Sequence, residues 1–266
     1  MKNLLLYSAI LIIFFSSCKK IIEVDTNNAQ PQIVIEGQIS DQLTDQKIII
    51  SKSVGYSEPG VYPKISGAVV TVNDDKGSRY TFTEKTPGVY VQAMRGVPGN
   101  TYNMSVSIDG KTYTASSKMP NLIKLDSIGI ESNNFFGKER KNAAAYLSDP
   151  ANEINFYRFN LYVNNIISNR IYVNNDRLTN GNKLRIQLFY GTDDEDNDGL
   201  KSGDHITVEA ESIDTHVFDY WYSLSQQTGR GPNQGTTPAN PPSNISNGAL
   251  GYFSAHSYLR KSITVK

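Results

Sequence analysis

Apolar and polar residues alternate in short segments along residues 32–121. Gly67–Asn73 (GAVVTVN) and Arg79–Glu84 (RYTFTE) place apolar or β-branched side chains at every second position, which predicts strands with one buried face. Turn residues separate the segments, and Asp109-Gly110 is a pair preferred in two-residue hairpins. About seven such strands, with turns roughly every 8–12 residues, predict an immunoglobulin- or transthyretin-like β-sandwich over residues 32–121.

Alternation continues in residues 122–266, where we expect a second, larger β domain. Its strands are predicted at Lys124–Glu131, Ile154–Val163, Ile166–Val173, Lys183–Tyr190, His205–Ile213, Ala249–Ala255 and Tyr258–Val265. The intervening segment Ser132–Pro150 is polar and irregular, and a short helix is predicted around Lys141–Tyr146. The predicted fold class is therefore mostly β, in two domains.

One stretch has a strong helical period. Apolar residues fall at i, i+3, i+4 and i+7 on Val217, Tyr220, Trp221 and Leu224. Asp214 precedes this stripe as an N-cap, and Gly229 follows it as a stop. We therefore predict one helix packed on the second domain.

Three aromatic residues of this helix raise a functional alternative. Tyr220, Trp221 and Tyr222 could form a platform on which a carbohydrate ring stacks. Tyr220 and Trp221 share the apolar stripe, however, so a place in the core is favoured for both. Tyr222 lies off the stripe and is expected to be exposed.

The N-terminal residues follow a different pattern. Lys2 precedes the apolar run Leu4–Phe15, and two serines then lead to Cys18, the only cysteine. This order is typical of a bacterial lipoprotein signal, in which residues 1–17 are removed and Cys18 is acylated, for example with palmitate. An uncleaved membrane anchor is disfavoured because a spanning helix needs about 20 apolar residues. An ordinary secretory signal would need the cysteine to stand there by chance.

Residues 18–31 then form a polar tether below a lipid anchor. Lys19 rather than aspartate follows the cysteine, which argues against the usual signal for retention at the inner membrane. We expect an outer-membrane lipoprotein, either periplasmic or surface-exposed, and the choice of leaflet stays open.

Composition narrows the classes of function. Lys and Arg number 26 and Asp and Glu number 26, so no basic face for nucleic acid is indicated. After lipidation of Cys18 no thiol remains for a disulfide or for thiol chemistry. No nucleophile elbow, metalloprotease motif or phosphate-binding glycine loop is present, and we predict no catalytic residues.

An acidic run offers the one candidate metal site. Asp194, Asp196 and Asp198 alternate and are followed by Gly199, as at the start of a Ca²⁺-binding loop. His205 stands at position twelve, where such a loop needs a bidentate glutamate, so a solvated hairpin loop is the favoured alternative. No other cofactor is expected. The three histidines, His205, His216 and His256, lack the spacing of metal ligands.

Two further segments carry candidate surface chemistry. Gly229–Asn247 is a long loop rich in glycine, proline and asparagine, and loops of this length are often functional. Its candidate partner-binding residues are Gly229, Arg230, Asn233 and Asn240. Asp126-Ser127-Ile128 is similar to the O-glycosylation signal of Bacteroidetes, which makes Ser127 the candidate acceptor.

An ordered series of motifs resembles one family. IVIEGQIS, SGAVVTVNDDKG, VPGNTY and DGKTYTA in the first half precede SIDTHVFDYWYSL and PPSNISNGALGYFSA in the second. Together with the lipoprotein signal, they resemble the DUF4249 family, uncharacterised lipoproteins of Bacteroidetes. The resemblance implies an envelope protein and a role beside a TonB-dependent receptor. It supplies no catalytic residues, because the family has no established activity.

We therefore expect a non-enzymatic binding or accessory lipoprotein of the outer membrane, associated with a TonB-dependent uptake system. Two alternatives stay open: a hydrolase acting on glycans or peptides, and a purely structural envelope protein. Paired carboxylates of the glycosidase kind lie far apart in a chain, so the sequence does not decide between these classes.

Overall fold

The computed structural model describes residues 30–266 apart from residues 56–59, 61, 136–137, 152, 192–198 and 229–238. Its first-half strands are β1 (Ile33–Ser40), β2 (Thr44–Lys52), β3 (Val69–Asp74), β4 (Arg79–Thr86), β5 (Val89–Met94), β6 (Thr101–Ile108) and β7 (Lys111–Lys118). The second half contains β8 (Lys124–Phe135), β9 (Lys138–Ser148), β10 (Phe156–Val163), β11 (Ile166–Ile167), β12 (Tyr172–Asn175), β13 (Lys183–Leu188), β14 (His205–Ile213), helix α2 (Thr215–Thr228) and β15 (Leu250–Thr264).

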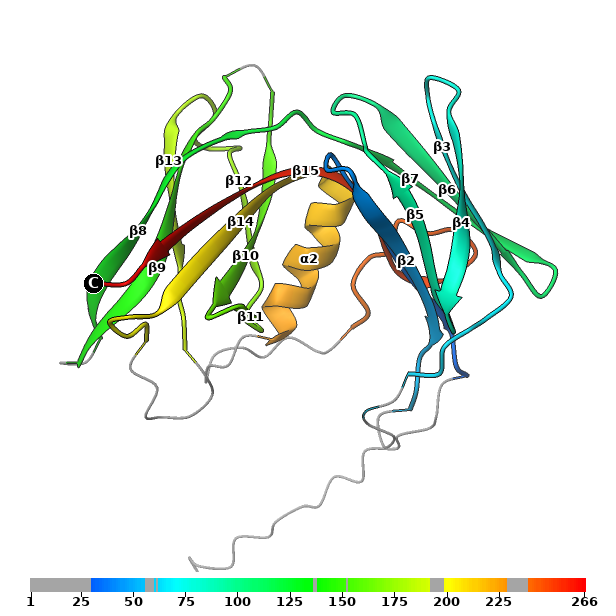
Figure 1. Cartoon of the computed structure of the whole chain (residues 1–266), viewed down its shortest axis with the longest axis horizontal. Helices are drawn as coiled ribbons and strands as arrows, with labels where there is room; N and C mark the ends of the chain where they lie inside the picture. Colours follow the sequence, from blue (N-terminus) through cyan, green and yellow to red (C-terminus); the bar gives the residue numbers. More distant parts are fainter. Residues whose placement is uncertain are drawn as a thin grey trace, which may run out of the picture.

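The strands form two groups with α2 between them (Figure 1). We call β1 to β7 the first wing and β8 to β14 the second wing. One sheet has the order β11-β10-β14-β15-β1-β2-β5-β4-β3-β6-β7, with β12 on β10, and a three-stranded sheet has the order β13-β9-β8. The predicted mostly β fold, with an immunoglobulin-like sandwich first and one packed helix in the second half, is confirmed.

The first wing is built by the alternation that its sequence predicts. Inward residues of β1 and β2, such as Ile35 and Ile48, meet inward residues of β3 and β6, such as Val72 and Met104, in one buried core. The hairpin at Asp109-Gly110 is present, and both residues have positive φ angles, 48° and 72°. These angles are what a two-residue turn between right-twisted strands requires.

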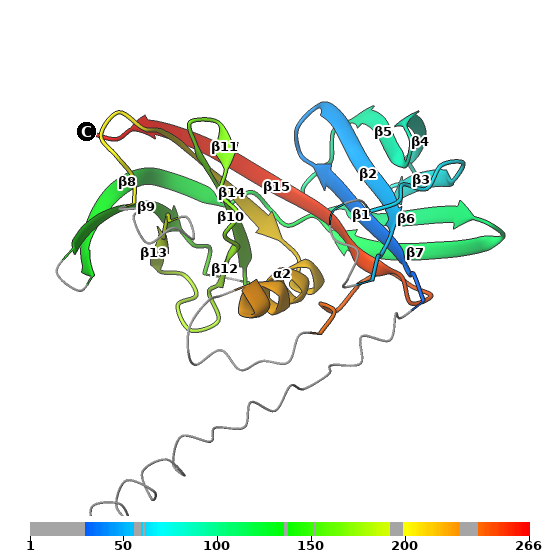
Figure 2. The ribbon, with the colours of Figure 1, turned by 90° about the horizontal axis from the view of Figure 1, so that it is seen from below.

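The last strand joins the two wings. Two closing strands were predicted, Ala249–Ala255 and Tyr258–Val265, and this prediction is wrong because β15 is continuous. Its residues 250–256 pair in parallel with β1, and residues 257–264 pair antiparallel with β14. The predicted division at residues 121 and 122 falls between β7 and β8, yet β15 crosses it in space (Figure 2).

The core of the second wing lies between β10, β14 and the end of β15 on one side and β8, β9 and β13 on the other. The helix predicted around Lys141–Tyr146 is wrong, since these residues belong to β9. Ala143, Ala144 and Ala145 favour a helix intrinsically, but they pair with β8 and β13 on the two sides of β9 and are fully buried. Tertiary pairing overrides the local preference here.

Helix α2 begins where the sequence predicts. The Asp214 carboxylate accepts a hydrogen bond from the Val217 backbone N–H at 2.9 Å, as an N-cap does. Val217 and Phe218 are buried against Phe156 and Ile213, and Tyr220 and Trp221 are half-buried in the same cluster. The apolar stripe therefore faces the core, although Phe218 was not part of the predicted stripe. No helix among the residues described is long and apolar enough to cross a membrane.

Residues 239–249 close the first wing between β7 and β15. The Ser246 N–H donates to the Thr114 carbonyl at 2.8 Å, and Ile245 forms a bridge with Ala115. On the other side, the Asn244 side chain bonds both the N–H and the carbonyl of Phe253, at 2.9 and 2.8 Å. The described end of the predicted loop Gly229–Asn247 thus acts as part of the sandwich wall.

Candidate functional site

Several predicted site residues lie outside the residues that the structure describes. They are Cys18, the acidic residues Asp194, Asp196 and Asp198, and the loop residues Gly229, Arg230 and Asn233. Lipidation, Ca²⁺ binding and partner binding at these positions therefore stay predictions.

The surroundings of the acidic run correct one interpretation. The favoured alternative to a Ca²⁺ site was a hairpin loop, but β13 and β14, which flank the run, belong to different sheets. Gly199 has a φ of 86°, and a Cβ there would lie 2.6 Å from the Lys141 carbonyl oxygen. Close packing against β9 therefore explains the glycine at this position, and no metal ion is needed to account for it.

Ser127 and the histidines are all described. Ser127 is exposed on β8, opposite Tyr146 on β9, so the candidate glycosylation residue is accessible. His205 and His216 are exposed, whereas His256 is buried and lies 3.2 Å from the Ser254 hydroxyl through Nδ1. Within the described residues, no three His, Cys, Asp or Glu side chains gather as metal ligands would.

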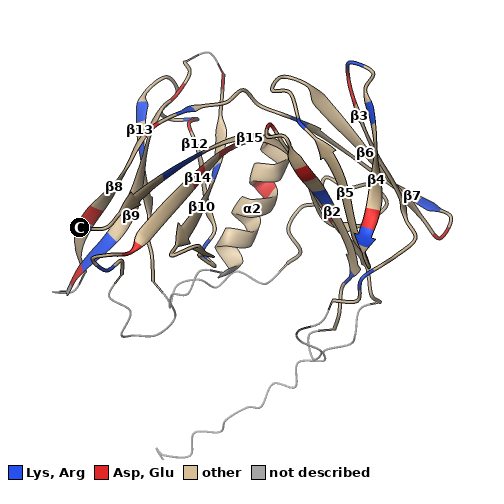
Figure 3. Cartoon of the chain, in the orientation of Figure 1, with Lys and Arg blue, Asp and Glu red and all other residues tan. Residues whose placement is uncertain are grey.

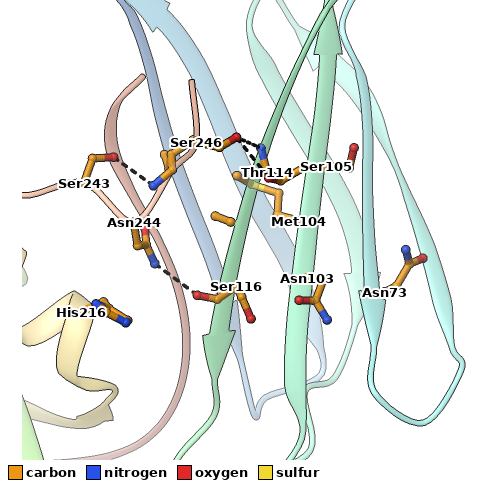
Figure 4. A pocket seen from close by; sticks show the side chains of 12 residues that line it. Asn73, Asn103, Met104, Ser105, Thr114, Ser116, His216, Ser243, Asn244 and Ser246 are labelled. Atoms are coloured by element: carbon orange, nitrogen blue, oxygen red, sulfur yellow. Dashed lines mark hydrogen bonds between the residues drawn. The ribbon is translucent and has the colours of Figure 1, made fainter. Parts of the chain in front are cut away.

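A polar groove runs over the outer face of β3, β6 and β7 and has a volume of about 710 Å³ (Figure 4). It is lined by Asn73, Asn103, Met104, Ser105, Thr114, Ala115, Ser116, His216, Ser243, Asn244, Ile245 and Ser246. Strand register assembles this lining, because Asn103 lies opposite both Asn73 and Ser116. The α2-to-β15 connection forms one wall, and His216 from the first turn of α2 completes the rim.

The wall of this groove is internally bonded, and Thr114 of the floor bonds to it through both its N–H and its hydroxyl. The Ser246 hydroxyl accepts the Thr114 N–H at 2.8 Å, and the Ser243 hydroxyl accepts the Ile245 N–H at 3.2 Å. Asn103 carries no side-chain hydrogen bond to the described residues, and Asn73 Oδ1 is buried without a donor among them. The exposed Asn103 amide is therefore available to a ligand.

A second, smaller pocket of about 340 Å³ lies on the other side of the same connection. It is lined by Val34, Glu36, Ser51, Ser53, Tyr62, Lys64, Tyr220, Asn240, Pro241, Leu250 and Gly251. Burial, with a smaller contribution from the Glu36 carboxylate, raises the pKa of Tyr220. Asn240, a predicted partner-binding residue, is exposed here, so the described end of the predicted loop borders both hollows.

A network of charges lies beneath α2 on the sheet face opposite the core of the second wing. Arg158 donates to both oxygens of Glu211 at 3.0 and 3.1 Å, and Asn160 donates to Glu211 at 2.7 Å. The Arg158 guanidinium also lies 4.0 Å from the centre of the Trp221 ring. Although burial opposes ionisation, Arg158 and His256 hold the pKa of Glu211 below its usual value.

Among the residues that the structure describes, Asp149 and Asp176 form a pair of neighbouring carboxyls of the kind that a hydrolytic site uses. The Asn155 N–H donates to Asp176 Oδ1 at 2.8 Å, while the Tyr157 hydroxyl and the Gly181 N–H donate to Asp149. Burial and the neighbouring Asp149 carboxyl raise the pKa of Asp176. Asp176 is fully buried, however, and neither carboxyl lines the pockets described, so the pair fixes a turn and does not face substrate.

Replacing Asp176 by asparagine is expected to raise the midpoint of thermal unfolding by about 2–4 °C at pH 7. Asp176 Oδ2 has no donor among the described residues, and an amide NH₂ there would donate to Asp149, a gain of about 1 kcal/mol. The pKa of Asp176 is raised in the folded protein, so its protonated form is the one that stabilises the fold. This contribution is complete below the usual pKa of 3.8 and is lost as the pH rises through the raised pKa.

Calorimetry between pH 3 and 7 checks this prediction. The difference between the two proteins should be largest at pH 7 and should shrink in acid. Asp75→Asn, at an exposed turn residue, serves as the control and should leave the midpoint unchanged. A lower unfolding midpoint for Asp176→Asn than for the wild type at pH 7 would contradict the prediction, because it would show that the buried Asp176 carboxylate stabilises the fold.

The comparison with protein families places this chain. A model described as a domain of unknown function, DUF4249, matches residues 19–262. The chain belongs to the DUF4249 family. The family assignment expected from the motifs is thus confirmed, and it brings no described activity. No protein of the curated set matches this member of DUF4249.

Solved structures also match this DUF4249 chain. A two fibronectin type-III domain segment from chicken tenascin is 13% identical, with 90% of this chain and 100% of the tenascin segment covered. The TM-score is 0.24, so the description of the fold above rests on the strands and their pairing alone.

Proposed function

We propose that this DUF4249 protein is a lipid-anchored, non-enzymatic binding protein of the cell envelope, and that it serves as an accessory to a TonB-dependent receptor of the outer membrane. The lipoprotein signal ending at Cys18 supports the envelope location. The receptor is the partner that the family resemblance implies. The polar groove is the surface that we assign to ligand binding, and the predicted loop Gly229–Asn247 is the surface that we assign to the receptor.

The lining of the polar groove is the observation that carries this proposal. A hydrolase needs a nucleophile or an activated water held beside an acid and a base. The groove has amides and hydroxyls, and His216 is its single titratable side chain. The chemistry of this lining supports holding a ligand by hydrogen bonds and offers no acid–base pair.

A pull-down of the native lipoprotein from detergent-solubilised envelopes tests the proposed function. A C-terminal affinity tag is used, and co-purified proteins are identified by mass spectrometry. We expect a TonB-dependent receptor in near-equal amount, and we expect Cys18→Ser to lose it because the protein leaves the membrane. No reproducible receptor in the wild-type sample would reject the accessory role.

Substitutions in the predicted loop refine this experiment. Arg230→Ala with Asn233→Ala is expected to reduce receptor capture at least fivefold with an unchanged unfolding midpoint. Arg170→Ala with Asn180→Ala replaces the same residue types at exposed positions elsewhere and should capture the receptor normally. Equal capture by both double variants would remove the loop from the binding surface.

A further inference from the structure

The floor of the polar groove is an ordered array of uncharged polar side chains. Asn73, Asn103 and Ser116 lie opposite one another on three adjacent strands, and Ser105 and Thr114 form the next pair along the same face. Facing side chains are about 5 Å apart across strands, and alternate residues about 7 Å apart along them. The array therefore covers about 10 by 7 Å, a size suited to one or two sugar rings.

The chemistry of the lining excludes most other classes of ligand. No Lys, Arg, Asp or Glu lines the groove, so His216 is the one lining side chain that could carry a charge opposite a phosphate or another ionic group. Figure 3 shows β6 without a charged residue along its length. Met104, Ala115 and Ile245 are buried in the sandwich core, and no large apolar side chain of the lining is exposed for a lipid to pack on. The edge of β7 is bonded to Ser246 at Thr114, which leaves no free edge there for an added peptide strand.

The polar groups match a ligand rich in hydroxyls. Each asparagine side chain offers an acceptor oxygen and two N–H donors, which suits neighbouring hydroxyls that both donate and accept. Asn73 is half-buried and its Oδ1 lacks a donor among the described residues, so a turn of this amide toward the groove would let the oxygen accept a hydrogen bond from a sugar hydroxyl. Ser105 and Ser116 add hydroxyls on the same face.

We propose that this groove binds a neutral oligosaccharide. The Asn73 and Asn103 amides bond the hydroxyls of one sugar ring, and Ser105, Thr114 and Ser116 border the next. His216 and Ser243 limit the groove on the helix side. This assignment rests on the proposed binding function and gives the class of its ligand.

A carbohydrate array tests the proposal with the mature full-length lipoprotein in detergent. The array carries neutral gluco-, manno-, galacto- and xylo-oligosaccharides, together with acidic fragments of polygalacturonate and heparin. Saturable binding to at least one neutral oligosaccharide and none to the acidic fragments is expected. Binding to acidic fragments alone, or to no neutral oligosaccharide, overturns the proposal.

Calorimetric titration with the best neutral oligosaccharide then locates the site. Asn103→Ala with Ser116→Ala is expected to weaken binding at least tenfold. Ser107→Ala with Thr112→Ala changes the same strands on the same faces outside the groove and should leave the affinity within twofold. Equal affinity in both double variants would place the oligosaccharide elsewhere and reject the groove.

A blocking variant guards against effects on folding. Ser105→Trp adds a bulky ring at a half-buried position in the groove and should abolish binding without changing the unfolding midpoint. Retained binding by a folded Ser105→Trp protein overturns the proposal. Receptor capture without oligosaccharide binding would reject this ligand class and leave the proposed accessory function standing. Oligosaccharide binding without receptor capture would reject the accessory function and leave the ligand class standing.

Discussion

Replacing Glu211 by glutamine is expected to lower the free energy of unfolding by about 3–5 kcal/mol, the usual cost of breaking a buried ion pair from one side. Arg158 would keep its charge in a buried position, with side-chain exposure of 14%, and would lose its carboxylate partner. For a chain of this size, the midpoint of thermal unfolding should fall on the order of 10 °C.

The dependence on pH follows from the groups around Glu211. Arg158 and His256 favour its charged form, while Glu209 lies next to it on the same strand face. A lowered folded pKa means that Glu211 stabilises the fold above its usual pKa of 4.5, and that this contribution is lost as the pH falls through the lowered value. The glutamine variant should therefore lose less stability in acid than the wild type does.

Thermal and denaturant unfolding at pH 7 and pH 4 measure this effect. Lys124→Gln is the control, because the Lys124 side chain is 78% exposed in its pair with Asp126 and that pair is screened by water. Its midpoint should equal that of the wild type. A Glu211→Gln midpoint within about 2 °C of the wild type would falsify the view that a buried charge depends on this partner.

The sequence predicts the local elements well because their period is local. Alternation marks the strands of the first wing, and Asp214 with the stripe from Val217 to Leu224 marks α2. The predictions that were wrong concern segments whose structure is set by pairing with strands distant in the sequence. His256 and Ser257 interrupt the apolar pattern of β15 and suggested two strands, but both are buried where β15 passes from β1 to β14.

The polar groove was not predicted, since its residues come together only through strand register. Asn103 and Ser116 share the β6–β7 hairpin, whereas Asn73 reaches them only through the pairing of β3 with β6, and each is ordinary on the outer face of a strand. A signal was nevertheless present: the outward positions of β6 and β7 are Asn, Ser or Thr over several residues, without the charges usual on a solvent face. The pairing of β3, β6 and β7 brings these uncharged polar side chains together as the floor of the polar groove.

Replacing Gly251 by alanine is expected to lower the free energy of unfolding by about 4 kcal/mol or more, in the range reserved for severe core defects. Gly251 has a φ of 94°, and a Cβ there would lie 2.1 Å from the Ile35 carbonyl oxygen. Because that atom belongs to the β1 backbone, no side-chain rearrangement relieves the contact. Either β15 shifts away from β1, or its parallel pairing is lost.

Gly110→Ala provides a matched control for this prediction. Gly110 also has a positive φ, 72°, but a Cβ there meets nothing within 4 Å, so only the backbone cost of about 1 kcal/mol applies. Denaturant unfolding compares the two variants. In the Gly251→Ala protein, amides of both β1 and β14 should exchange their hydrogens faster, because β15 pairs with both strands. Equal stability of the two variants would mean that β15 does not lie this close to β1, and that the wings are joined more loosely.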